Sequence, residues 1–198
     1  TVMNVYASDT SEKIVQVHPS TVFAKISAGM GMPEGMEQEM QEMQNMSPMG
    51  GNANQMNVWA ELLDNPELLA KQYDVIAGKM PEAYNEVVLI VDENNEVSDY
   101  TLYALGLKNQ DEVSETMGKL MQGEKIEAVP VSYTYEDILA LSFKLLLNTD
   151  YFEKTEKGWE DRSEDDAYLR EKLSSATELR VVGILRPSEN SNMGSETG

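Results

Sequence analysis

Residues 86–107 read EVVLIVDENNEVSDYTLYALGL, and this stretch does more than any other to decide the fold class. It opens with Glu86–Val91, a β-branched and apolar run of the kind that forms a strand buried on both faces of a sheet. The polar residues Asp92–Glu96 then predict a turn. Ser98 is a good N-cap, so a helix is expected over Asp99–Leu105, ended by a glycine. A strand followed closely by a helix indicates a mixed α and β domain.

Outward from this stretch, strand-like and helix-like patterns follow one another without strict alternation. That mixture favours an α+β fold, a mixed sheet with packed helices, over a doubly wound sheet. Two further helix starts are marked by Asn65-Pro66 and by Thr134 with Asp137, because these residues suit N-cap and first-turn positions. Strands are expected at Met3–Tyr6, Ile14–Val17, Thr21–Ile26, Tyr73–Ala77, Ile126–Tyr133, Ser142–Asn148 and Leu179–Leu185. Helices are expected at Pro66–Gln72, Gln110–Met121 and Asp165–Leu173, a capped turn at Tyr135–Ala140, and a hairpin at Tyr151–Trp159 with Lys157-Gly158 at its tip.

The composition narrows the class of protein. The chain has 198 residues, which suits a single domain (1–198) with room for two subdomains. Its 35 acidic and 15 basic residues give a formal charge of −20, so nucleic acid and anionic lipid are disfavoured partners. There is no Cys, which removes disulfides, thiolate zinc sites and cysteine nucleophiles together. No apolar run reaches the ~18 residues of a membrane span, and no signal-peptide pattern opens the chain.

The segment 30–55 differs in composition from everything around it. It is rich in Met and Gly, and its first 20 residues contain no Val, Ile, Leu or aromatic residue. We expect a mobile insertion that carries a short amphipathic helix, with Met36, Met40, Met43 and Met46 as the candidate residues for contact with a partner. Three other interpretations stay open: the methionines cover their own domain, bind copper(I) through their thioethers, or touch a membrane surface, which the neighbouring Glu residues oppose.

Few residues are candidates for catalysis. His18 is the only histidine, and beside a proline it is expected to be a packing or surface residue rather than a general base. Asp92–Glu96 resembles the start of a calcium loop but lacks the Gly and Glu that an EF-hand needs further on. The acids of Asp161–Asp166 lie in a polar stretch, which is typical of a solvated helix start. With no phosphate-binding loop or hydrolase motif, the sequence predicts no enzyme and no catalytic, cofactor or metal residue.

Two longer stretches carry a family resemblance. One is 73–107, YDVIAGKMPEAYNEVVLIVDENNEVSDYTLYALGL, and the other is 143–187, which contains FKLLLNTDYFEKTEKGWED and ends in LRVVGILRP. They resemble the external domain of ABC transporter permeases of the FtsX-like class in Gram-positive bacteria, and more distantly the MacB-type periplasmic core domain. The shared pattern runs through AGKMP, NEVVL, a helix ending in LGL, and a late VVGI strand.

The resemblance implies an extracellular, membrane-anchored setting. The domain would lie between the first and second transmembrane helices of the same polypeptide, with residues 187–198 as a linker toward a membrane helix. A separate cytoplasmic ATPase subunit would drive its motion, and it would contact a peptide, lipoprotein or antibiotic cargo or a partner protein. Pairing with a second copy stays open. The alternatives are a binding module of another surface protein or lipoprotein, and a hydrolase that uses buried carboxylates.

Overall fold

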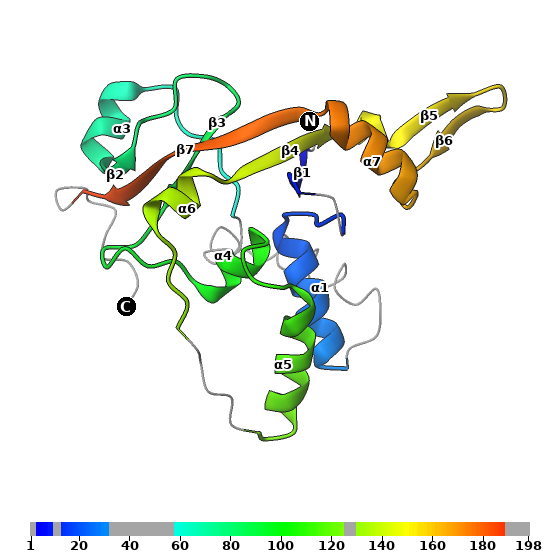
Figure 1. The fold of residues 1–198 in the computed structure, drawn as a ribbon, viewed down its shortest axis with the longest axis horizontal. Coiled ribbons are helices and arrows are strands. Elements are labelled where there is room, and N and C mark those ends of the chain that lie inside the picture. The colour runs from blue at the N-terminus through cyan, green and yellow to red at the C-terminus, as the bar shows by residue number, and fades with distance from the viewer. Residues whose placement is uncertain (1–2, 10–12, 32–57, 125–129, 189–198) are drawn as a thin grey trace, which may run out of the picture. The chain divides into compact units, whose positions relative to one another are not determined.

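The computed structural model describes residues 3–9, 13–31, 58–124 and 130–188. Two compact units share the chain (Figure 1). Unit 1 comprises Thr1–Val15, Glu61–Val97 and Ser132–Gly198, and unit 2 comprises Gln16–Ala60 and Ser98–Val131. The chain therefore passes from one unit to the other more than once.

The sheet of unit 1 is organised around its last strand. It contains β1 (Met3–Ala7), β2 (Tyr73–Gly78), β3 (Glu86–Ile90), β4 (Ser142–Leu147) and β7 (Thr177–Pro187). Along β7 the early residues pair antiparallel with β4, the late residues pair antiparallel with β2, and the stretch from Arg180 to Leu185 pairs in parallel with β3. β1 extends the sheet beyond β4. Figure 1 shows β7 running the length of this sheet.

Apolar residues of β7 and β4 supply much of the core of unit 1. Leu185 of β7 is fully enclosed, with an exposed fraction of 0 %. A second cluster joins Tyr6 of β1 and Leu146 of β4 to Leu169 and Leu173 of helix α7 (Asp166–Ser175). Tyr6 pairs in register with Lys144, two residues before Leu146, so Tyr6 and Leu146 lie on the same face of the sheet. Helix α7 covers that cluster.

Two further helices of unit 1 begin at residues that cap them. Asn65 caps α3 (Pro66–Gln72), and Thr134 with Asp137 forms a complete capping box on α6 (Tyr135–Leu139). A short 3-10 turn, η2 (Asn148–Tyr151), leads from β4 into a separate two-stranded sheet of β5 (Phe152–Thr155) and β6 (Gly158–Asp161). That hairpin carries the Lys157-Gly158 tip that the sequence predicts.

The described part of unit 2 contains three helices. They are α1 (Pro19–Gly29), α4 (Asp99–Ala104) and α5 (Asp111–Met121), and their buried centre is formed by Val22, Ala104 and Val113. Lys25 of α1 forms an ion pair with Asp111 at the start of α5. Further along, Gly29 lies so close to α5 that a Cβ there would come within 2.5 Å of the Ser114 carbonyl oxygen. Glycine therefore sets the closest approach of these two helices.

The α+β fold class is confirmed, and most expected elements are present within one or two residues. Strand β3 is an exception in its burial. Its first four residues are half-buried and Ile90 is 41 % exposed, so the strand is not enclosed on both faces as predicted. The likeness to a MacB-type fold stays a prediction.

Three strand predictions are wrong in the described residues. Thr21–Ile26 is part of helix α1, because His18 supplies an N-cap and Pro19 suits the first helical position, which outweighs the β-branched residues. Ile14–Val17 forms no strand, although the Ala7 amide donates to the Val15 carbonyl at 2.9 Å. The described end of the predicted strand at Ile126–Tyr133 is also irregular, as Pro130 favours.

Candidate functional site

The four methionines that the sequence singles out, Met36, Met40, Met43 and Met46, lie outside the described residues. Most of the predicted mobile insertion at 30–55 and of the predicted linker at 187–198 lies outside them too. The roles predicted for these segments, including the copper(I) and membrane alternatives, therefore stay predictions. The candidate surfaces below come from other parts of the chain.

His18 closes the start of helix α1. Its Nδ1 accepts a hydrogen bond from the Ser20 amide at 3.1 Å and lies 2.6 Å from Ser20 Oγ. Burial lowers the pKa of the imidazole, which favours the neutral ring that can accept at Nδ1. The nitrogen facing the Ser20 hydroxyl is thus engaged as a helix cap, so this pair is structural rather than a nucleophile with its base.

The calcium-like segment Asp92–Glu96 is a tight turn. Asp92 Oδ1 accepts hydrogen bonds from the amides of Asn94 at 2.9 Å and Glu96 at 2.7 Å. Asn95 adopts a left-handed conformation with φ of 63°, which Asn tolerates better than most residues. A side-chain oxygen turned onto its own backbone in this way accounts for the polar composition without a bound cation.

Several acids around β6 make local contacts. Arg162 Nη2 lies 2.9 Å from Glu153, and its Nη1 lies 3.7 Å from Asp165. Asp161 Oδ1 accepts the Ser163 amide at 2.8 Å, and the hydroxyl and amide of Ser163 hold the pKa of that carboxyl below its usual range. A carboxylate hydrolase needs such acids buried together in a cleft. These side chains are exposed or half-exposed, so the structure does not support that hypothesis.

The described residues contain few buried polar side chains. Within them, Ser27 is the one buried polar side chain, and no group of three or more His, Cys, Asp or Glu residues is arranged to hold a metal ion. No helix in the same ranges combines the length and apolar character that crossing a bilayer demands.

Two glycines from distant stretches of sequence meet in unit 1. Gly78, at the end of β2 with φ of 73°, pairs in register with Gly183 of β7. A Cβ on Gly183 would lie 2.1 Å from the Lys79 carbonyl oxygen, and one on Gly78 would lie 2.1 Å from the Val182 carbonyl oxygen. Neither glycine can be replaced by a larger residue unless the backbone moves. The close approach of the two glycines therefore determines where the chain leaves β2.

The loop that follows, residues 79–85, is held by one carboxylate. Glu86 Oε2 accepts the amides of Glu82 at 2.6 Å and Ala83 at 3.2 Å, and Glu86 Oε1 lies 2.9 Å from Lys79 Nζ. The Glu82 amide and the Lys79 ammonium lower the pKa of Glu86, and Glu86 together with Glu82 raises the pKa of Lys79. Each of these contacts favours the charged side chains, which ties the loop to the start of β3.

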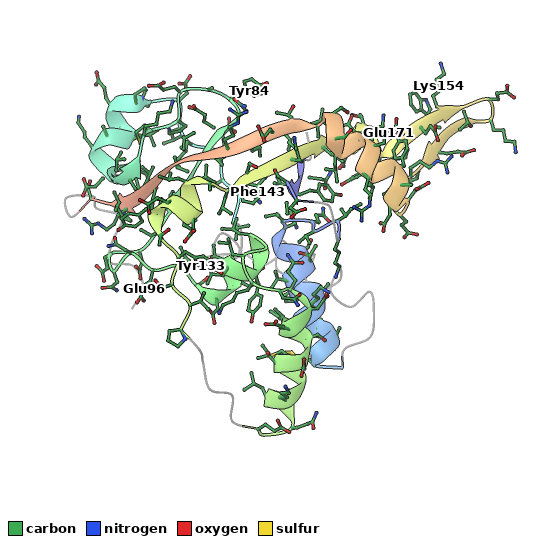
Figure 2. All side chains as sticks on the ribbon, viewed as in Figure 1. Tyr84, Glu96, Tyr133, Phe143, Lys154 and Glu171 are labelled. Carbon is green, nitrogen blue, oxygen red and sulfur yellow. The ribbon has the colours of Figure 1, made fainter. Side chains whose placement is uncertain are left out.

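Tyr84 stands at the tip of this loop (Figure 2), with 89 % of its surface exposed. An aromatic side chain on an ordered loop loses little entropy on binding, because the backbone is already arranged. Sequence reasoning missed Tyr84, because the neighbouring AGKMP motif is a structural pattern and carries no chemistry of its own. The only local signal was an aromatic residue in a turn between a proline and a strand.

A second exposed aromatic surface lies on the β5–β6 hairpin. Trp159 is 69 % exposed and Phe152 is 43 % exposed. The sequence predicted the hairpin but not which residues of it would face solvent.

The comparisons with known proteins find no relative of this chain. No protein-family model matches the chain, and searches of curated proteins and of solved structures find no match either.

Proposed function

We propose that this chain is a non-catalytic extracytoplasmic domain of an ABC transporter permease of the FtsX-like class. In this proposal it contacts a peptide, lipoprotein, antibiotic or partner protein outside the cell membrane. A separate cytoplasmic ATPase subunit moves the transmembrane helices of the same polypeptide, and the domain moves with them.

One observation carries the proposal. The two stretches that resemble the family are separated by dozens of residues, yet their key glycines pair in one ladder: Gly78 of AGKMP with Gly183 of VVGI. The NEVVL stretch pairs with the same strand, in parallel, through β3. The resemblance therefore describes one coherent piece of structure around β7 rather than two unrelated fragments.

Strand β7 also suits a mechanical role. It has 11 residues and is hydrogen-bonded to β2, β3 and β4. A displacement applied at its end would be shared by three neighbouring strands, since packed regular elements transmit motion as units. In the family, the equivalent late strand runs back toward the membrane. The exposed Tyr84 lies on the loop between two of these neighbours, where it would move with them.

The proposal makes one geometric demand. Because β1 and β7 are both antiparallel to β4, they run in the same direction, and Met3 lies near the Thr177 end while Pro187 lies at the other. The ten steps from Thr177 to Pro187 cover about 33 Å of strand. For both ends to reach one membrane surface, the chain that follows Pro187 must cover a similar distance.

The complete parent gene provides the test. We expect one hydrophobic helix before Thr1, three after Gly198, and an adjacent ATPase gene whose product copurifies with the permease in detergent. A parent with a single N-terminal anchor and no later helices would instead identify a binding module of another surface protein or lipoprotein. A parent with neither arrangement would refute both.

A further inference from the structure

The two faces of the β5–β6 hairpin have different surroundings. Tyr151, one residue before β5, packs against the buried cluster beneath α7. Along β5, Glu153 and Thr155 are half-buried whereas Phe152 and Lys154 are exposed, so Phe152 and Lys154 point away from that cluster. Their register partners are Asp161 and Trp159, which share the same face. The hairpin therefore has an inner face that continues toward the core and an outer face formed by Phe152, Lys154, Trp159 and Asp161.

The charged and polar side chains of the inner face make contacts within the chain. Glu153 and Glu160 lie directly opposite each other, a repulsive pair by itself. Arg162 relieves the repulsion, with Nη2 at 2.9 Å from Glu153 and 3.6 Å from Glu160. Thr155 Oγ1 donates to the Gly158 carbonyl oxygen at 3.1 Å and closes the tip. This face needs no partner.

The outer face is different because its apolar area remains in water. Trp159 is 69 % exposed and stands opposite Lys154, while Phe152 is 43 % exposed on the diagonal. Figure 1 shows the hairpin extending beyond α7, and Figure 2 shows Lys154 on it. Exposed aromatic pairs on a regular element are typical of contact surfaces rather than of a solvated ribbon.

The hairpin also has free edges. Among the described residues, β5 pairs only with β6 and neither strand joins another sheet. An edge strand offers unpaired backbone donors and acceptors, and an extended peptide can use them to add a strand.

The negative charge around the hairpin favours a basic peptide. Between Asp150 and Asp166 there are eight acidic and three basic residues, a balance of −5, and the whole chain carries −20. A basic segment is attracted by this field, and its Arg or Lys side chains can stack on the Trp159 indole. The same field repels an anionic membrane surface and a second copy of the chain.

We propose that the β5–β6 hairpin docks a basic, extended segment of a partner protein, which adds a strand at an edge and places cationic side chains over Trp159 and Phe152. This inference stands apart from the transport proposal, since it rests on the hairpin alone and can be tested on the present chain without a membrane.

The test is a calorimetric titration of the 198-residue chain with a short synthetic peptide in which Arg alternates with Val. A peptide with Glu in place of Arg is the charge control. We expect the Arg peptide alone to bind, with Trp159→Ala weakening it about ten-fold and Trp159→Phe keeping part of the affinity. Tyr135→Ala is the matched control, because it removes a ring that is 43 % exposed elsewhere in unit 1 and should leave binding unchanged.

A second variant tests the sign of the charge argument. Lys154→Glu removes the cation opposite Trp159, so it should strengthen binding of the Arg peptide by about two-fold to five-fold. Weaker binding in this variant would contradict the proposal.

Four other outcomes would overturn it: no binding of the Arg peptide, equal binding of the Glu peptide, Trp159-dependent binding to phosphatidylglycerol vesicles, or dimerisation that Trp159→Ala abolishes. Folding does not confound these comparisons, since an exposed side chain contributes little to stability and thermal melting of each variant will verify it.

Discussion

Each compact unit has glycine where two segments approach closely, but the contacts around the glycine differ between the units. In unit 1, Gly78 and Gly183 allow β2, β7 and the following loop to cross, and hydrogen-bonded ladders surround the crossing. In unit 2, Gly29 allows α1 to approach α5 at Ser114, and the buried side chains of Val22 and Val113 belong to one apolar cluster of these helices. A ladder fixes its register, whereas two helices can shift against each other. Replacing a glycine should therefore destabilise the protein more in the sheet than between the helices.

The largest expected effect comes from Gly183→Ala. The added Cβ would meet the Lys79 carbonyl oxygen at 2.1 Å, and a strand paired on both sides cannot move away. We expect a loss of about 3 kcal/mol in the free energy of unfolding, measured by denaturant titration. Gly118→Ala is the control, since its Cβ would come no closer than 3.8 Å to Gly29 and Ala suits a helix better than Gly. Equal losses in the two variants would contradict the packing argument.

The next effect tests unit 2 directly. Gly29→Ala places a Cβ at 2.5 Å from the Ser114 carbonyl oxygen and 2.8 Å from Met117 Cβ. Because α1 and α5 can separate slightly, we expect a smaller loss of about 1–2 kcal/mol. Amide hydrogen exchange should locate the loss in α1 and α5. If Gly29→Ala costs as much as Gly183→Ala, or opens both units alike, the contrast between ladder and helix packing fails.

A buried hydroxyl pair gives the third prediction. Tyr6 and Tyr151 share a hydrogen bond of 2.5 Å between their hydroxyl oxygens, and burial raises the pKa of each phenol, so both stay protonated. Tyr151→Phe leaves the Tyr6 hydroxyl without this partner and should cost about 1 kcal/mol in unfolding free energy. The double variant Tyr6→Phe with Tyr151→Phe should cost less than the sum of the two single changes. Strict additivity would show that the pair contributes nothing.

A pH effect that depends on histidine is expected in unit 2, because His18 is the only histidine of the chain. Burial lowers the pKa of His18 below its ordinary value of 6.5, so the folded state favours the neutral ring that caps α1. This stabilisation is complete above pH 6.5 and is lost as the pH falls through the lowered pKa. Hydrogen exchange in α1 should quicken over that window. His18→Asn keeps a cap that does not titrate, so it should remove the pH dependence; an unchanged profile would refute the assignment.

The smallest effect concerns the hairpin. Arg162→Met removes the cation between Glu153 and Glu160 while keeping much of the aliphatic stem. Because these side chains are well exposed, the melting temperature should hardly change, but the amides of β5 and β6 should exchange faster than those of β7. Lys154→Met, on the outer face, is the matched control and should leave the exchange unchanged. A large drop in melting temperature would mean that the hairpin belongs to the core of unit 1.

Much of the fold was predictable because its signals are local. Asn65-Pro66, Ser98 and Thr134 each satisfy free amides at a helix start within three residues, so their role can be read in the sequence alone. The hairpin likewise follows from a Lys-Gly tip between two short strands. The absence of a typical catalytic motif was also visible in the sequence. The exposed aromatic residues were not, since nothing local distinguishes a solvated Trp159 from a buried one.

The sequence by itself determined the fold class, the helix starts and the acidic charge, because each depends on residue type or on neighbours a few positions away. Only the tertiary structure decided that Thr21–Ile26 is helical, that β3 is half-exposed, and that Gly78 meets Gly183. The physical reason is that burial and pairing are properties of two segments at once. A β-branched run becomes a helix when a cap and a packing partner outweigh its own preference, and a strand is enclosed only when another element covers it.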